Sequence, residues 1–252
     1  MPRLMATDDA QIITTPGPGN FQFSAVRIEE LGASEYTLVT IICDISGSVM
    51  GFADHLLKCI KTIVNATKKN DRSENILIRL ITFNQDIYEI HGFKNVSDID
   101  LDAYEPLKCD GFTALYDASY DGIGGTLEFS KRLVEQDFDV NGAVYIITDG
   151  MNNRGSMTPR SIAEKCQSAL AKEEIISLVT ILIGLHDPGS HWATQVKEHL
   201  EEFKKDAELT EFLDVGEATP EKLAKLANWV SESVSSQSQS LVTGAPSQSL
   251  SF

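Results

Sequence analysis

LVTIICDISGSVM, residues 38–50, joins an apolar run to a polar series in which Asp44, Ser46 and Ser48 occupy alternate positions. A continuous apolar run of this kind is typical of a strand buried on both faces of a parallel sheet. The residues after Met50 begin a helix-like pattern. The chain therefore leaves a buried strand either through a polar turn or through a site lined with oxygen atoms, which would suit a hard cation.

Short apolar runs alternate with amphipathic segments along most of the chain. One predicted strand, 86–91, begins only a few residues after another predicted strand ends at residue 83. This link is too short for the helical crossover that parallel strands need, so we expect the two strands to pair antiparallel at a sheet edge. The other predicted strands are 36–43, 76–83, 143–148, 177–185 and 211–215. Helices are predicted where apolar residues recur at spacings of three and four, over 50–69, 115–136, 159–173, 191–207 and 220–235.

This alternation predicts an α/β fold. We expect a Rossmann-like, doubly wound, mostly parallel six-stranded sheet with one antiparallel edge strand and helices on both faces, formed by residues 36–235. Residues 1–35 contain the breaker cluster TTPGPGN at 14–20 and are predicted to be an N-terminal arm with one short extended piece. In such folds ligands bind beyond the C-terminal ends of the strands, which is where Asp44 lies.

Residues 236–252 form a predicted C-terminal tail that is rich in Ser and Gln, with SQSL at 238–241 and again at 247–250. One interpretation is a solvated, disordered tail. The other is a docking segment in which Leu241, Leu250 and Phe252 fill apolar pockets of the same chain or of a partner. Both interpretations stay open at this point.

Composition narrows the classes of partner. The formal net charge is −16, which repels phosphate backbones and makes nucleic acid an unsuitable partner. We expect no membrane span, because no run approaches the ~18 apolar residues that one needs. The four cysteines form no C-x-x-C pair, and the N-terminus does not resemble a secretory signal, so we expect a reducing, cytoplasmic location.

Three polar clusters lie where loops of such a sheet converge. They are Asp44, Ser46 and Ser48 after the first predicted strand, Thr113 in CDGFTALYD at 109–117, and Asp149 in IITDG at 146–150. Together they offer two carboxylates and three hydroxyls. This set suits Mg²⁺, which prefers oxygen ligands and keeps several waters, and it leaves room for an acidic group from another molecule.

These motifs, in this order along residues 36–235, resemble a von Willebrand factor A (vWA) domain with a complete metal-ion-dependent adhesion site. The resemblance implies that Ser46, Ser48 and Thr113 coordinate Mg²⁺ directly, with Mn²⁺ or Ca²⁺ as other candidates. It implies that Asp44 and Asp149 act mainly through bound waters and by orienting the hydroxyls. It also implies a protein partner that supplies an Asp or Glu carboxylate to the metal.

We therefore expect a non-catalytic, Mg²⁺-dependent protein-binding module. By resemblance to intracellular vWA proteins of bacteria and phages, its setting would be a stress-response system or a partnership with an AAA+ ATPase. One alternative is a structural subunit of a larger assembly that docks through its tails. Another is a metal-dependent phosphohydrolase with Asp44 as nucleophile, although Ser46 occupies the position where such enzymes place a second acid. The sequence does not predict the oligomeric state.

Overall fold

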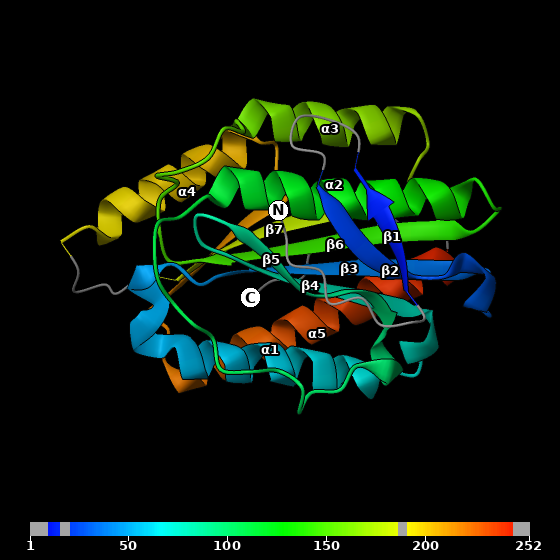
Figure 1. Cartoon of the computed structure of the whole chain (residues 1–252), viewed down its shortest axis with the longest axis horizontal. Coiled ribbons are helices and arrows are strands. Elements are labelled where there is room, and N and C mark those ends of the chain that lie inside the picture. The colour runs from blue at the N-terminus through cyan, green and yellow to red at the C-terminus, as the bar shows by residue number, and fades with distance from the viewer. Residues whose placement is uncertain (1–9, 16–20, 186–190, 244–252) are drawn as a thin grey trace.

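The structure, a computed structural model, describes residues 10–15, 21–185 and 191–243 (Figure 1). Within these residues eight strands form one sheet with helices packed against it. The strands are β1 (Ala10–Thr14), β2 (Gln22–Val26), β3 (Glu35–Asp44), β4 (Ile76–Phe83), β5 (Ile87–Asn95), β6 (Asp139–Thr148), β7 (Ser177–Leu185) and β8 (Glu211–Gly216). The helices are α1 (Ala53–Lys68), α2 (Leu115–Val134), α3 (Pro159–Ala171), α4 (Ala193–Asp206) and α5 (Pro220–Thr243).

The strand order is β1-β2-β5-β4-β3-β6-β7-β8, and β3, β4, β6, β7 and β8 are mutually parallel. The predicted α/β fold class, with a mostly parallel sheet and helices on both faces, is confirmed. Two details of the prediction are wrong. The sheet has eight strands rather than six, and β5, although antiparallel to β4 as predicted, is not an edge strand because β2 pairs with its other side.

The two additional strands come from the predicted N-terminal arm. Gly92 of β5 makes the close approach of β2 possible, because a Cβ at this position would lie 1.7 Å from the Ser24 carbonyl oxygen. The backbone N–H and the hydroxyl of Ser24 both donate to Oε1 of Glu89, at 2.8 and 2.6 Å. The other oxygen of Glu89 accepts from buried Arg79 at 2.9 Å. The N-terminal strands are thus attached to the sheet through a buried ionic group.

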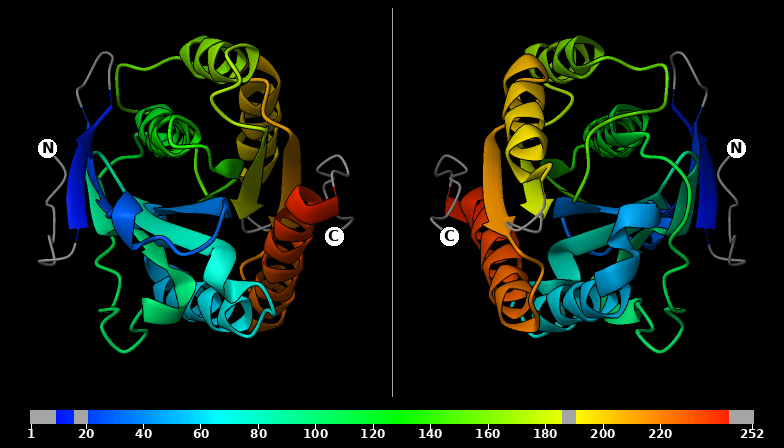
Figure 2. Two further views of the ribbon diagram at one scale, coloured as in Figure 1. Left: turned by 90° about the vertical axis from the view of Figure 1, so that its right-hand side faces the viewer. Right: turned by 90° about the vertical axis from the view of Figure 1, so that its left-hand side faces the viewer.

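The helices lie in two layers, with α1 and α5 on one face of the sheet and α2, α3 and α4 on the other (Figures 1 and 2). Neighbouring residues of β3 contribute to opposite cores, since successive side chains of a strand alternate between faces. Ile41 packs in the core with Ile60 of α1, and Ile42 packs in the core with Ile123 of α2. Burial on both faces explains why the central strands are continuously apolar.

Helix α5 continues to Thr243, beyond the predicted end at 235 and into the predicted tail. Hydroxyl groups secure this part of the helix: Arg72 donates to Ser238 Oγ at 3.1 Å, and Asn141 donates to Ser240 Oγ at 3.0 Å. Residues 236–243 are therefore helical rather than disordered. Leu241 is half-buried in this helix, whereas Leu250 and Phe252 lie outside the described residues.

The C-terminal ends of the parallel strands form one edge of the molecule. Strand β3 is followed by α1 and leads to β4 on one side, while β6 pairs with its other side, so the chain order reverses between β3 and β6. This is the position at which open α/β sheets bind ligands. Asp44 ends β3 and Asp149 follows β6, so both predicted acidic residues lie at this reversal.

Candidate metal centre

Asp44 organises the loop that leaves β3. Its carboxylate is fully buried and accepts two hydrogen bonds, from the backbone N–H of Ser46 at 2.8 Å and from the hydroxyl of Thr148 at 2.5 Å. Ile45 turns inward and its backbone bonds to Phe83 and Asp110. The chain can then expose Ser48 at the start of the 3₁₀ segment Gly47–Phe52.

The hydroxyls of this loop connect directly to Asp149. The oxygens of Ser46 and Ser48 are 3.2 Å apart, and Ser48 donates to Oδ1 of Asp149 at 2.8 Å. The pairing of β3 with β6 places Cys43 opposite Ile147, which aligns the two loops. Ser46 is buried, whereas Ser48 is exposed and Asp149 half-buried, so the group opens to solvent on one side.

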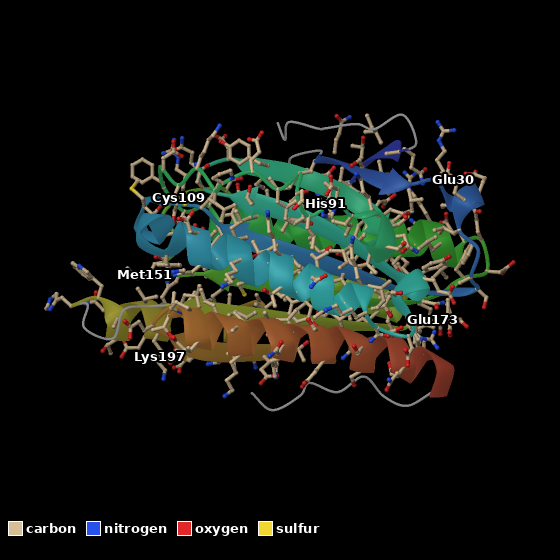
Figure 3. All side chains as sticks on the ribbon, turned by 90° about the horizontal axis from the view of Figure 1, so that it is seen from below. Glu30, His91, Cys109, Met151, Glu173 and Lys197 are labelled. Atoms are coloured by element: carbon tan, nitrogen blue, oxygen red, sulfur yellow. The ribbon has the colours of Figure 1, made fainter. Side chains whose placement is uncertain are left out.

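Thr113, which lies just before α2, is held at the same edge by hydrogen bonds to the loop that follows β6. Its N–H donates to Oδ1 of Asn153 at 2.8 Å, and its carbonyl accepts from the N–H groups of Asn153 and Arg154. A Cβ placed on Gly150 would lie 3.6 Å from the Thr113 hydroxyl oxygen, which puts this hydroxyl beside the residue after Asp149. The structure thus brings all five predicted residues to one end of the sheet. Cys109 and Met151, from two of the loops concerned, lie at that end in Figure 3, opposite Glu30 and Glu173.

The two carboxylates carry charge that the protein itself does not neutralise. Burial, and secondly the charge of Asp44, raise the pKa of Asp149 to about 7, against the opposing effect of the Ser48 hydrogen bond. Burial also raises the pKa of Asp44, although its bonds from Thr148 and Ser46 act in the opposite direction. Among the described residues, no Lys or Arg forms an ion pair with either carboxylate. A divalent cation would supply the missing positive charge.

The donor set fits a hard cation such as Mg²⁺. Hydroxyl and carboxylate oxygens are the ligands that this ion prefers, and an opening to solvent leaves space for its waters. Within the described ranges no group of three or more His, Cys, Asp and Glu side chains could hold a metal. The candidate site is of another kind, since it combines two carboxylates with the hydroxyls of Ser46, Ser48 and Thr113.

Several residues that support this site were not predicted from the sequence. Thr148 binds Asp44, and Asn153 holds Thr113 as described above. Asn152 accepts from the N–H of Tyr116 at 3.1 Å, and its own N–H donates to Nε2 of His199 at 3.2 Å. The one signal in the sequence is the pair of asparagines directly after the TDGM segment, where polar side chains with both donors and acceptors can join neighbouring loops.

Comparison with known proteins supports the assignment of the fold. No family model and no curated protein matches the sequence. Solved structures do match: the PilB minor pilin from Streptococcus sanguinis has a TM-score of 0.57 and 15% identity over 96% of this chain and 78% of its own. The pilus adhesin SpaC from Lactobacillus rhamnosus GG has a TM-score of 0.54 and 11% identity, with coverage of 91% and 35%.

A third similar structure is proximal thread matrix protein 1 from the mussel byssus, described with a zinc-occupied MIDAS motif. Its TM-score is 0.50 at 21% identity, over 81% of this chain and 47% of its own. At these identities the likeness establishes the fold alone. The chain has a Rossmann-like α/β fold of the vWA type. In the part of the chain that the structure describes, no helix is long and apolar enough to cross a membrane.

Proposed function

We propose that this chain is a non-catalytic, Mg²⁺-dependent protein-binding module, and that an Asp or Glu of a partner completes the coordination of its metal. The observation that carries the proposal is the hydrogen-bonded chain from Ser46 through Ser48 to Asp149 at the reversal of the sheet. A dication held by two carboxylates and neutral hydroxyls retains affinity for a further anionic ligand. Bound Mg²⁺ would act as a Lewis acid that accepts this carboxylate.

The hydrogen bonds suggest different roles for the residues. Both oxygens of Asp44 already accept bonds from Ser46 and Thr148, which suits a residue that shapes the loop and acts on the metal through water. Ser46, Ser48 and Thr113 would bind Mg²⁺ directly. Asp149 would orient Ser48 and contribute negative charge next to the ion.

The same contacts favour binding over phosphoryl transfer. A nucleophilic carboxylate needs access to its substrate, and the Asp44 side chain is fully buried with both oxygens occupied. Ser46, two residues later, cannot serve as the second acid that protonates a leaving group. These observations support a module that holds a partner rather than one that hydrolyses a phosphoester.

The setting of this module also remains a proposal. The four cysteines, which lie in the described residues, are all free thiols, as suits a reducing compartment such as the cytoplasm. We propose that the module works in an intracellular bacterial or phage multiprotein system.

Partner capture with and without Mg²⁺ tests the proposed function. Immobilised chain is incubated with lysate in Mg²⁺, bound proteins are eluted with EDTA, and candidates identified by mass spectrometry are purified and their affinities measured. Ser48→Ala removes one hydroxyl from an exposed position, and Ser97→Ala is the matched control at an exposed serine outside the site. We expect partner binding to be lost in EDTA. In Mg²⁺ it should be lost in Ser48→Ala and kept in Ser97→Ala. Binding that survives both changes would exclude a metal bridge.

A further inference from the structure

Two exposed apolar side chains lie next to the candidate metal centre. Met50 is 65% exposed and follows Ser48 by two positions, and Phe112 is 58% exposed and directly precedes Thr113. Exposed large apolar residues are scarce in the described chain; the others are Ile12, Leu170, Ile176 and Trp192. Single exposed apolar residues are ordinary on protein surfaces. Two of them beside one site, from loops far apart in the sequence, indicate an interaction surface.

The loops that carry Met50 and Phe112 are in contact. The N–H of Gly47 donates to the carbonyl of Gly111 at 3.3 Å, and a Cβ on Gly47 would lie 3.6 Å from this same oxygen. In a 3₁₀ segment, residues three apart lie on the same side, so Met50 lies on the side of Gly47. Phe112 follows Gly111 directly. Both apolar side chains therefore flank a single junction between the two loops that supply hydroxyls to the metal site.

The charges around this junction limit what a partner can present. Exposed acidic residues are Asp54 at the start of α1, Asp86 between β4 and β5, and Asp110 beside Gly111. Lys108, on the loop of Asp110, and Arg154, on the loop after β6, are exposed bases, and the whole chain carries a net charge of −16. These groups give no net attraction for a run of acidic residues. Attraction for one carboxylate comes from the metal, and the surface next to it is apolar.

Resting on the proposed function, we propose that the partner segment presents one Asp or Glu flanked by apolar side chains, which pack on Met50 and Phe112. Apolar contacts around the carboxylate would exclude water from the metal bond, and Coulomb attraction strengthens as the local dielectric falls. Interfaces commonly surround a few strongly contributing central residues with contacts that exclude water. Met50 suits this use because its flexible, polarisable side chain adapts to different apolar neighbours.

A peptide library tests this specificity directly, because the selection itself identifies the flanking residues that bind. The probe is a synthetic library of short peptides with a fixed central Asp and randomised flanking positions, selected on the full chain in Mg²⁺ and eluted with EDTA. We expect enrichment of aliphatic and aromatic residues next to the Asp. Enriched peptides are then labelled, and their affinities for the protein and its variants are measured by fluorescence anisotropy.

Phe112→Ser and Met50→Ser remove the apolar contacts, while Ile176→Ser is a control because Ile176 is also 58% exposed but precedes β7 at the other end of the sheet. We expect each of the first two to weaken peptide binding about ten-fold or more, the effect of losing a buried apolar side chain, with Mg²⁺ affinity in calorimetry unchanged. Ile176→Ser should change neither.

The outcomes separate this inference from the proposed function. Mg²⁺-dependent binding of acidic peptides without apolar flanks, or with affinity unaffected by Phe112→Ser and Met50→Ser, would overturn the apolar specificity and leave the metal bridge intact. If no acidic peptide binds in a Mg²⁺-dependent manner, the proposed function and this inference both fail.

Discussion

The hydroxyl of Ser48 donates a hydrogen bond of 2.8 Å to Oδ1 of Asp149, although 101 positions separate the two residues. The contact exists because β3 and β6 are parallel neighbours that end at the same edge of the sheet. It joins the loop that carries Asp44, Ser46 and Ser48 to the loop that carries Asp149. The candidate metal centre therefore depends on strand pairing as much as on the residues themselves.

Replacing Asp149 should stabilise the metal-free protein and at the same time abolish its stabilisation by Mg²⁺. Burial and the nearby charge of Asp44 disfavour the ionised form of Asp149, whose pKa is raised to about 7. At pH 8 and without metal, Asp149→Asn removes this charge and should raise the free energy of unfolding by on the order of 2 kcal/mol. The same variant should no longer be stabilised by added Mg²⁺. Chemical denaturation with and without MgCl₂ measures both effects, and a loss of stability in the metal-free variant would contradict this electrostatic picture.

Asn153 should affect metal binding without touching the metal. Its side chain accepts from the N–H of Thr113, and we expect Asn153→Ala to weaken Mg²⁺ binding about ten-fold, as is usual for residues that orient metal ligands. Calorimetric titration with MgCl₂ measures the change. Asn95→Ala is the control, because Asn95 likewise accepts a backbone N–H, from Ser97, but lies outside the site. Equal affinities for Asn153→Ala and Asn95→Ala would show that Thr113 does not depend on this bond.

The buried ion cluster should be essential for stability. Arg79 bonds to Glu89 at 2.9 Å and to Asp121 at 3.2 Å, and all three side chains are at most 1% exposed. Arg79→Met leaves two carboxylates buried without their cation, which typically costs about 3–5 kcal/mol. Arg72→Met, which breaks the more exposed pair with Glu35, should cost about 1 kcal/mol or less. Urea denaturation distinguishes the two, and similar losses would mean that the buried cluster contributes no more than a surface pair.

His91 should make the protein less stable in mild acid. Its Nδ1 donates to the Gly92 carbonyl at 2.9 Å, and its Nε2 accepts from the Tyr104 hydroxyl at 2.7 Å. Burial, with a smaller contribution from Lys94, lowers the pKa of His91 to about 4. Between pH 6.5 and 4 the unfolded chain therefore binds a proton that the native state does not, so stability falls as the pH falls through this range.

This contribution should amount to about 2 kcal/mol between pH 7.5 and pH 5. The measurement is the free energy of unfolding of wild type and His91→Gln at both pH values. Wild type should lose about this much more than the variant, since glutamine does not titrate. His55→Gln, at an exposed histidine, should behave like wild type. Parallel pH profiles for wild type and His91→Gln would contradict a neutral, buried His91.

Much of the fold could be predicted because its signals are local. Continuous apolar runs mark the strands β3, β4, β6 and β7, and the short link between residues 83 and 87 requires an antiparallel pair. The position of Asp44 after the first of these strands placed a candidate site at the reversal of the sheet. The five site residues could be proposed because each follows a predicted strand or precedes a predicted helix.

The features that were missed depend on partners distant in the sequence. A short extended piece was predicted within residues 1–35, but the pairing of β2 with β5 was not, because it depends on Gly92 in β5 and on the bond from Ser24 to Glu89. The end of α5 was predicted to be a tail because serine-rich segments are commonly solvated. In the structure its hydroxyls accept hydrogen bonds from Arg72 and Asn141 instead. Neither relationship leaves a periodic pattern in the sequence.

Calorimetric titration of purified wild type and Ser48→Ala with MgCl₂ tests the metal centre most directly. Ser97→Ala serves as the matched control. We expect one saturable site in wild type and Ser97→Ala, and at least a ten-fold weaker affinity in Ser48→Ala, because a direct hydroxyl ligand is lost. The absence of saturable binding in wild type, or an unchanged affinity in Ser48→Ala, would contradict a Mg²⁺ site built on Ser48 and Asp149.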